Sequence, residues 1–147
     1  HAYVIGEHGD SEFVPWSQAL ISVKPLDDFK ATHPALDEDM KQIAVDVKES
    51  AYAIIKAKNA TYYGIGMVLA RLTRAILFDE NSIFTVSAYL KGEYGQRGIY
   101  IGVPAVVNRN GVREVLQMDL NEEEKAKFAA SADVIHEMIE EIGMDRG

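Results

Sequence analysis

The chain has 147 residues, the size of one ordinary domain, and its 48% hydrophobic and 26% charged residues are typical of a globular fold. The absence of cysteine excludes a disulfide scaffold and suits a reducing cytoplasm, while 23 acidic against 15 basic residues, a net charge of −8, disfavour nucleic-acid binding. No apolar run approaches the roughly 20 residues that span a bilayer, so we expect a soluble, cytoplasmic protein without a membrane partner.

Residues 1–18, HAYVIGEHGDSEFVPWSQ, place a short polar stretch between two apolar runs. The runs are rich in β-branched and aromatic residues, which predicts two extended segments joined by a loop, EHGDSE. The sequence begins at His1 inside an apolar segment, as expected for a piece of a longer protein.

The next two segments have helical periodicity. From Asp37 onward, apolar residues recur at spacings of three and four, which predicts a long amphipathic helix. Lys58 and Asn59 interrupt the pattern, and a second one opens at Thr61 and ends before the polar residues 79–81. Two helices are therefore expected to meet at KNAT.

The remainder predicts strands followed by a helix. SIFTVSAYL and GIYIGVPAVV are rich in β-branched and aromatic residues, which predicts strands. Asn110-Gly111 favours a type I′ hairpin turn, so we expect the sheet to be at least partly antiparallel. Asn121 and Glu124 form a capping box for a last helix, and Gly143 is a plausible stop. This order predicts one α+β domain.

The polar stretch GEHGDS carries the first candidate for chemistry. An imidazole titrates near neutral pH and nearby carboxylates stabilise its protonated form, so His8 is a candidate general acid and base. Gly6 and Gly9 leave room for close approach of a substrate. Two alternatives stay open on the residues alone: a solvated turn without chemistry, or a metal site in which His8, Asp10 and Glu12 share one face of an extended segment.

Thr61 stands at the start of the second expected helix. Its hydroxyl and the free backbone N–H groups of a helix start suit a ligand, and they suit a plain N-cap equally well. The glycines at 64 and 66 lack a third partner and lie inside a helical pattern, so they do not form a dinucleotide-binding fingerprint.

HAYVIGEHGDSEFVPWS closely resembles the active-site signature of the L-lactate dehydrogenases, within the lactate/malate dehydrogenase family. AYAIIKAKNATYYGIGMVLARLTRAIL is similar to the paired helices of the bacterial members, and SAYLKGEYGQRGIYIGVPAVVNRNGVREV is similar to their C-terminal sheet. The resemblance covers essentially the whole chain.

The family pairs an N-terminal Rossmann domain that binds NAD with a C-terminal catalytic and substrate domain. By the resemblance, residues 1–147 correspond to the second domain, whose α+β fold packs a mixed or antiparallel sheet with long helices, and the NAD-binding domain is absent from this chain. His8 is implied to donate a proton to the pyruvate carbonyl as hydride arrives from NADH. The carboxylate partner of this histidine lies upstream in the family, so Asp10 is not expected to orient His8.

Four further residues take implied roles from the resemblance. Thr61 matches a threonine of the substrate pocket, which favours lactate over malate, and Ile65 matches the isoleucine that packs on the nicotinamide ring. His1 matches the histidine that binds a phosphate of fructose 1,6-bisphosphate in allosteric bacterial members. Tyr52 falls at a position that is phosphorylated in some relatives.

The resemblance therefore implies an NAD-dependent L-lactate dehydrogenase that acts on pyruvate and L-lactate, holds no metal, and works as a homo-oligomer, usually a tetramer. Malate dehydrogenase of the same family is the near alternative. For the isolated chain, which we expect to be inactive, the alternative is a non-catalytic module for oligomerisation or effector binding.

Overall fold

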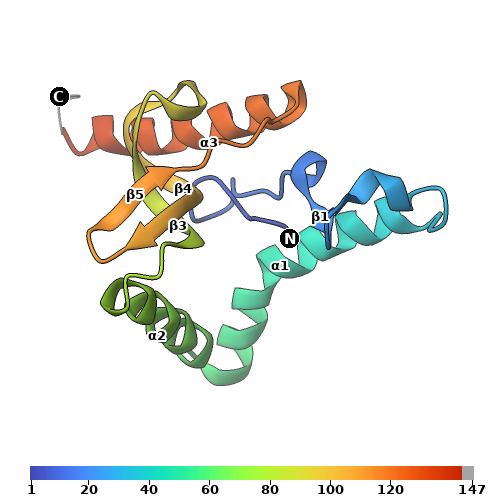
Figure 1. Ribbon diagram of the computed structural model, residues 1–147, viewed down its shortest axis with the longest axis horizontal. Coiled ribbons are helices and arrows are strands. Elements are labelled where there is room, and N and C mark those ends of the chain that lie inside the picture. The colour runs from blue at the N-terminus through green and yellow to red at the C-terminus, as the bar shows by residue number, and fades with distance from the viewer. Residues whose placement is uncertain (144–147) are drawn as a thin grey trace.

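A computed structural model describes residues 1–143 (Figure 1). A three-stranded antiparallel sheet has the order β3-β4-β5, and a small antiparallel pair, β1-β2, lies near the start of the chain. In chain order the elements are η1 (Trp16–Gln18), β1 (Leu20–Ile21), β2 (Lys24–Pro25), η2 (Leu26–Phe29), α1 (Leu36–Lys58), α2 (Tyr63–Leu77), β3 (Ser82–Lys91), η3 (Glu93–Gly95), β4 (Arg97–Asn108), β5 (Gly111–Val115) and α3 (Glu122–Glu141). The predicted α+β class is confirmed.

The hydrophobic core lies between one face of the sheet and α3. Ile99, Ile101 and Val103 alternate along β4 and are all buried, as the period-two pattern predicts. Phe128 and Ala132, one turn apart on α3, complete the same cluster. The core thus fixes α3 against the central strand, and this pair of elements supports the N-terminal loop.

The start of α3 is capped as the sequence predicts. The Asn121 side chain accepts the Glu124 N–H at 2.9 Å, and the Glu124 carboxylate accepts the Asn121 N–H at 3.1 Å, which together form a capping box. The Glu124 carboxylate, although buried, also accepts the backbone N–H and the hydroxyl of Ser17. Gly143 follows the helix with φ +69°, consistent with the predicted stop.

The predicted hairpin between β4 and β5 is present, but its turn is not type I′. Asn108 pairs with Gly111, so Arg109 and Asn110 are the central residues of the turn; a type I′ turn needs positive φ at both, and neither has it. The Asn110 N–H donates to the Asn108 side chain at 2.9 Å, a local bond that asparagine commonly makes in turns. The positive φ, +90°, lies instead at Gly111, the first residue of β5.

The two extended segments expected in residues 1–18 form isolated bridges rather than strands. Ile5 and Phe13 exchange N–H···O bonds of 2.9 and 3.0 Å, and Gly6 exchanges bonds of 3.0 and 2.9 Å with Gly102 of β4. Gly6, at φ +112°, turns the chain from one partner to the other. Pro15 then leads into η1, because proline has no N–H to continue a ladder.

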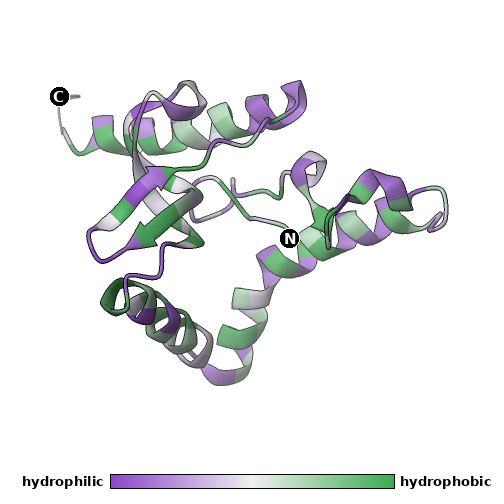
Figure 2. Ribbon diagram, viewed as in Figure 1, coloured by the Kyte–Doolittle hydropathy of each residue, from purple (hydrophilic) through white to green (hydrophobic). Residues whose placement is uncertain are grey.

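The two long helices leave their apolar faces open. Both helices are confirmed, and Asn59, at φ +61°, ends α1 where the sequence predicts a break. None of the residues Leu36–Lys58 is buried, and within α2 Ala75 is the buried residue. Figure 2 shows hydrophobic residues along both helices; α1 extends away from the sheet and α3, whereas α2 lies beside the sheet. A surface of this kind is typical of a partner-covered face.

Thr61 does not cap α2. The N-cap position is Tyr62, which makes no side-chain capping bond, and the helix begins at Tyr63. The N-cap interpretation of Thr61 is therefore wrong.

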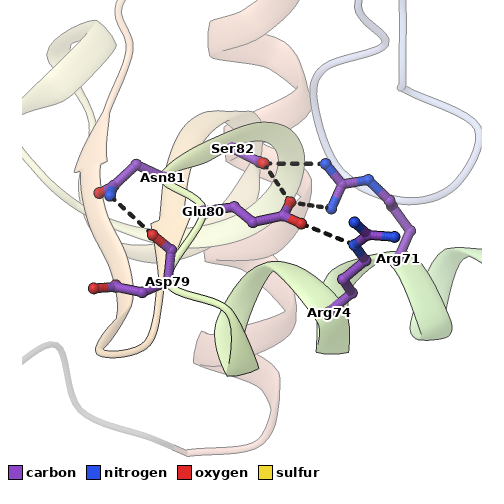
Figure 3. A network of polar contacts seen from close by, with 6 residues as sticks. All are labelled: Arg71, Arg74, Asp79, Glu80, Asn81 and Ser82. Carbon is purple, nitrogen blue, oxygen red and sulfur yellow. Dashed lines mark hydrogen bonds and ion pairs between the residues drawn. The ribbon is translucent and has the colours of Figure 1, made fainter.

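A polar network joins the end of α2 to the start of β3 (Figure 3). The Glu80 carboxylate accepts hydrogen bonds from Arg71 at 2.6 Å, from Arg74 at 3.0 Å and from the Ser82 hydroxyl at 3.0 Å. The bond from Arg71, followed by those from Ser82 and Arg74, holds the pKa of the Glu80 carboxyl below its ordinary value of 4.5.

This shift predicts a pH dependence of stability. A lowered carboxyl pKa stabilises the fold above the ordinary value and loses that contribution as pH falls through the lower folded value. We expect E80Q to flatten the decline in the free energy of unfolding below about pH 4.5. Urea unfolding at pH 7 and in acid measures this, with E137Q on the exposed side of α3 as control. An unchanged acid decline in E80Q would show that the network carries no such linkage.

Candidate active site

The loop GEHGDS presents His8 to solvent at the edge of the domain. The His8 side chain has a relative exposure of 104%, and its Nδ1 lies 3.5 Å from a Glu12 carboxylate oxygen. The loop leaves the fold at Gly6, which is paired with β4, and returns at Phe13, which is paired with Ile5. His8 is therefore an accessible imidazole on a loop whose two ends are hydrogen-bonded to the fold.

Asp10 pairs with α1 rather than with His8. Its carboxylate lies 3.1 Å from Lys48 Nζ, and the same ammonium donates to the Asp10 carbonyl at 3.2 Å. Glu12 pairs with His8 while Asp10 pairs with Lys48, although all three residues of the metal alternative line one small cavity. Within residues 1–143, no group of three or more histidine or acidic side chains could hold a metal ion.

Two cavities adjoin His8. One of about 530 Å³ lies between residues 2–8 and the sheet, where Thr85 and Ser87 of β3 and Tyr100 of β4 line it. A second of about 110 Å³ lies between the loop and α1 and is lined by residues that include Lys48 and Tyr52. The histidine is placed where a small ligand could reach it from either side.

The structure brings Tyr52, but neither Thr61 nor Ile65, to the cavities beside His8. Thr61 lies in the connection between α1 and α2, and Ile65 lies in the first turn of α2; both are exposed, Ile65 to 52%. Neither lines the two cavities described above. Tyr52 is 65% exposed on α1.

His1 is held through its backbone. Its amino group donates to the Leu20 carbonyl at 2.6 Å, and the Leu20 N–H donates to the His1 carbonyl at 2.8 Å. His1 itself is exposed.

The structure adds two residues that sequence reasoning missed. Lys48 reaches the loop from α1, and Ser131 reaches it from α3, where its hydroxyl accepts the Glu7 N–H at 2.7 Å. Lys48 lies 38 residues from its partner and Ser131 lies 124 residues from its own. No local sequence signal joins positions so far apart, and only the tertiary fold reveals them.

The family model for the lactate/malate dehydrogenase α/β C-terminal domain matches residues 1–144. The chain belongs to the lactate/malate dehydrogenase family. Within this family it is 55% identical over 138 residues to L-lactate dehydrogenase 2 of Bacillus cereus, and 56% identical over 133 residues to L-lactate dehydrogenase of Geobacillus stearothermophilus. These matches cover 93% and 90% of this chain but 44% and 42% of the relatives, so the chain spans less than half of their length.

Solved structures of the family have the same fold. The ligand-bound minor L-lactate dehydrogenase from Enterococcus mundtii matches with a TM-score of 0.93 at 41% identity, over 99% of this chain and 46% of that one. A lactate dehydrogenase from a Medee basin deep-sea metagenome library matches with a TM-score of 0.91 at 43% identity, over 95% of this chain and 45% of that one. The predicted family and fold are confirmed. None of the helices in residues 1–143 is both long and apolar enough to cross a membrane.

Proposed function

We propose that residues 1–147 are the C-terminal catalytic and substrate domain of an NAD-dependent L-lactate dehydrogenase, which interconverts pyruvate and L-lactate. The observation that carries the proposal is the exposed His8 on a hydrogen-bonded loop beside a cavity of about 530 Å³. The identity of 55% to a B. cereus L-lactate dehydrogenase supports this substrate pair. A Rossmann domain outside this chain would hold most of the dinucleotide.

The residues present fit the nicotinamide end of NAD. Ile65, Val68 and Leu69 form an exposed apolar surface on α2, which suits the face of an aromatic ring and keeps water away from it. Bound NADH supplies the hydride for pyruvate reduction. Ile65 would pack on the nicotinamide, as the family resemblance implies, and Thr61 would line the substrate pocket beside it.

His8 performs the proton transfer in this proposal. As the carbonyl carbon of pyruvate gains hydride, the imidazolium of His8 gives its proton to the carbonyl oxygen, and it takes the proton back when L-lactate is oxidised. In this chain the Glu12 carboxylate lies 3.5 Å from Nδ1 of the ring. The upstream carboxylate that the resemblance implies would replace this contact in the complete enzyme and fix the orientation of the ring.

The open faces of α1 and α2 support assembly with other parts of a larger enzyme. Ile43, Val47 and Ile54 on α1 are each more than 40% exposed, and so are Ile65 and Leu69 on α2. Apolar surface of this extent is usually covered in the working protein. We propose that the NAD-binding domain and further subunits of a cytoplasmic homotetramer cover these faces.

Two regulatory roles belong to the same proposal. The exposed His1 is available for a phosphate of fructose 1,6-bisphosphate at a subunit interface, and the exposed Tyr52 is available for phosphorylation. Because Tyr52 lines the small cavity beside His8, a phosphate there would place negative charge next to the catalytic loop.

The proposed function is tested by comparing how fast the complete protein oxidises L-lactate and D-lactate. With NAD and L-lactate it should produce NADH, measured by absorbance, and with D-lactate at the same concentration it should produce almost none. Absence of NADH formation with L-lactate would contradict the proposal.

The isolated chain should be inactive. It lacks a dinucleotide fingerprint, so we expect residues 1–147 alone to show neither saturable NADH binding by fluorescence titration nor pyruvate reduction. Saturable binding with turnover would refute this, whereas formation of stable oligomers without either would favour the non-catalytic assembly module.

A further inference from the structure

We propose that Ser131 is a positioning residue that sets the place of the His8 loop from within α3. The inference rests on the proposed function, because it assigns Ser131 a part in proton transfer by His8. Ser131 is a polar side chain that is fully buried, at 0% exposure, in the middle of α3.

The Ser131 hydroxyl joins a directed chain of hydrogen bonds. Its Oγ accepts the Glu7 N–H at 2.7 Å and lies 3.0 Å from the Ser11 hydroxyl. The Ser11 hydroxyl donates to the Glu7 carboxylate at 2.7 Å, which uses the one proton that Ser11 has. The proton between the two serines must therefore come from Ser131, which donates to Ser11 and accepts from Glu7.

These contacts hold both sides of the histidine. Glu7 directly precedes His8 and Ser11 follows it by three residues, so a single hydroxyl fixes the entry and the exit of the loop. The His8 side chain itself is fully exposed. The position of its ring therefore depends on the backbone that Ser131 holds.

Gly6 gives a second, independent observation that the fold brings the His8 loop close to Ser131. A Cβ at Gly6 would lie 2.7 Å from Ser131 Oγ, closer than real Cβ atoms come, and Gly6 has a φ of +112°. Glycine at this position therefore lets the loop reach the hydroxyl of α3 while it also pairs with Gly102.

The same helix provides a matched control. Near its N-terminus, the Glu124 carboxylate accepts the backbone N–H and hydroxyl of Ser17, which is another serine contact between the N-terminal segment and α3. Ser17 lies nine positions beyond His8 and outside the loop. S17A therefore removes an anchor of the same kind without touching the residues that flank the histidine.

The experiment uses the complete enzyme with S131A, S11A, the double variant and S17A. Because small misplacements of a catalytic group are costly, we expect S131A and S11A each to lower kcat for pyruvate reduction by about 10-fold to 100-fold, and the double variant to be no worse than about 2-fold below either. S17A should stay within about 2-fold of wild type, and all four should keep the wild-type Kd for NADH.

The H8Q variant separates a positioning role of Ser131 from a general effect of Ser131 on the structure. In H8Q, adding S131A should cause no further loss of kcat, because Ser131 acts through the imidazole; a further loss would overturn the proposal. S11A keeps the test decisive should S131A fold poorly, since Ser11 is only partly buried. Wild-type kcat in S131A or S11A would overturn the inference alone, whereas a wild-type enzyme inactive on pyruvate would overturn the proposed function with it.

Discussion

Replacement of His8 by glutamine in the complete enzyme is expected to lower kcat for pyruvate reduction by about 10²- to 10⁴-fold, which is the usual contribution of a general acid. Glutamine keeps polarity and similar size but cannot release a proton near neutral pH. The imidazole lies outside the core, at 104% relative exposure, so the substitution should not disturb folding. Stopped-flow and steady-state NADH oxidation measure the loss, and fluorescence titration should give a wild-type Kd for NADH.

His33 provides the control for this substitution. It is an exposed histidine before the start of α1, and its Nδ1 contacts the Thr32 hydroxyl and the Phe29 carbonyl rather than the His8 loop. H33Q should therefore keep the wild-type kcat. If H8Q kept more than about a tenth of wild-type kcat, the assignment of His8 as proton donor would be wrong.

Phe128→Ala is expected to destabilise the fold by about 3–5 kcal/mol, because it opens a cavity where α3 packs on the sheet. The Phe128 ring is 1% exposed and its centroid lies 4.7 Å from that of Tyr94. A loss of this size is comparable to the total stability of many domains. It should appear as a large fall in the urea midpoint, or as loss of the unfolding transition.

Met138 on the same helix provides the matched comparison. It is 53% exposed, so M138A should change the free energy of unfolding of the isolated chain by no more than about 0.5 kcal/mol. Equal effects of F128A and M138A would contradict the placement of the core between α3 and the sheet.

The elements that the sequence predicts well are those with local signals. The capping box of Asn121 and Glu124, the break at Asn59 and the alternation along β4 each depend on residues a few positions apart, and each is present. The pairing of residues 1–18 has no such local signal, because Gly6 pairs with Gly102, 96 positions further along the chain. The predicted type I′ turn is wrong, because the pairing of Asn108 with Gly111 makes Arg109 and Asn110 the central residues, and neither has a positive φ.

The candidate site likewise contains residues that a local sequence signal predicts and residues that only the tertiary fold brings together. His8 and its glycines are recognisable from one short stretch, whereas Ser131 and Lys48 come from helices that only the fold brings to the loop. The periodicity of α1 correctly indicates an amphipathic helix, yet none of the residues Leu36–Lys58 is buried within residues 1–143. Periodicity identifies an apolar face without identifying what covers it.

The most direct test of the central claim compares two 2-oxo acids in the complete enzyme. Steady-state NADH oxidation gives kcat/KM for pyruvate and for oxaloacetate under the same conditions. An L-lactate dehydrogenase with Thr61 in its substrate pocket should prefer pyruvate, by at least about 10-fold. A preference for oxaloacetate would identify the malate dehydrogenase branch of the family, and no oxidation of NADH with either acid would contradict the proposed function altogether.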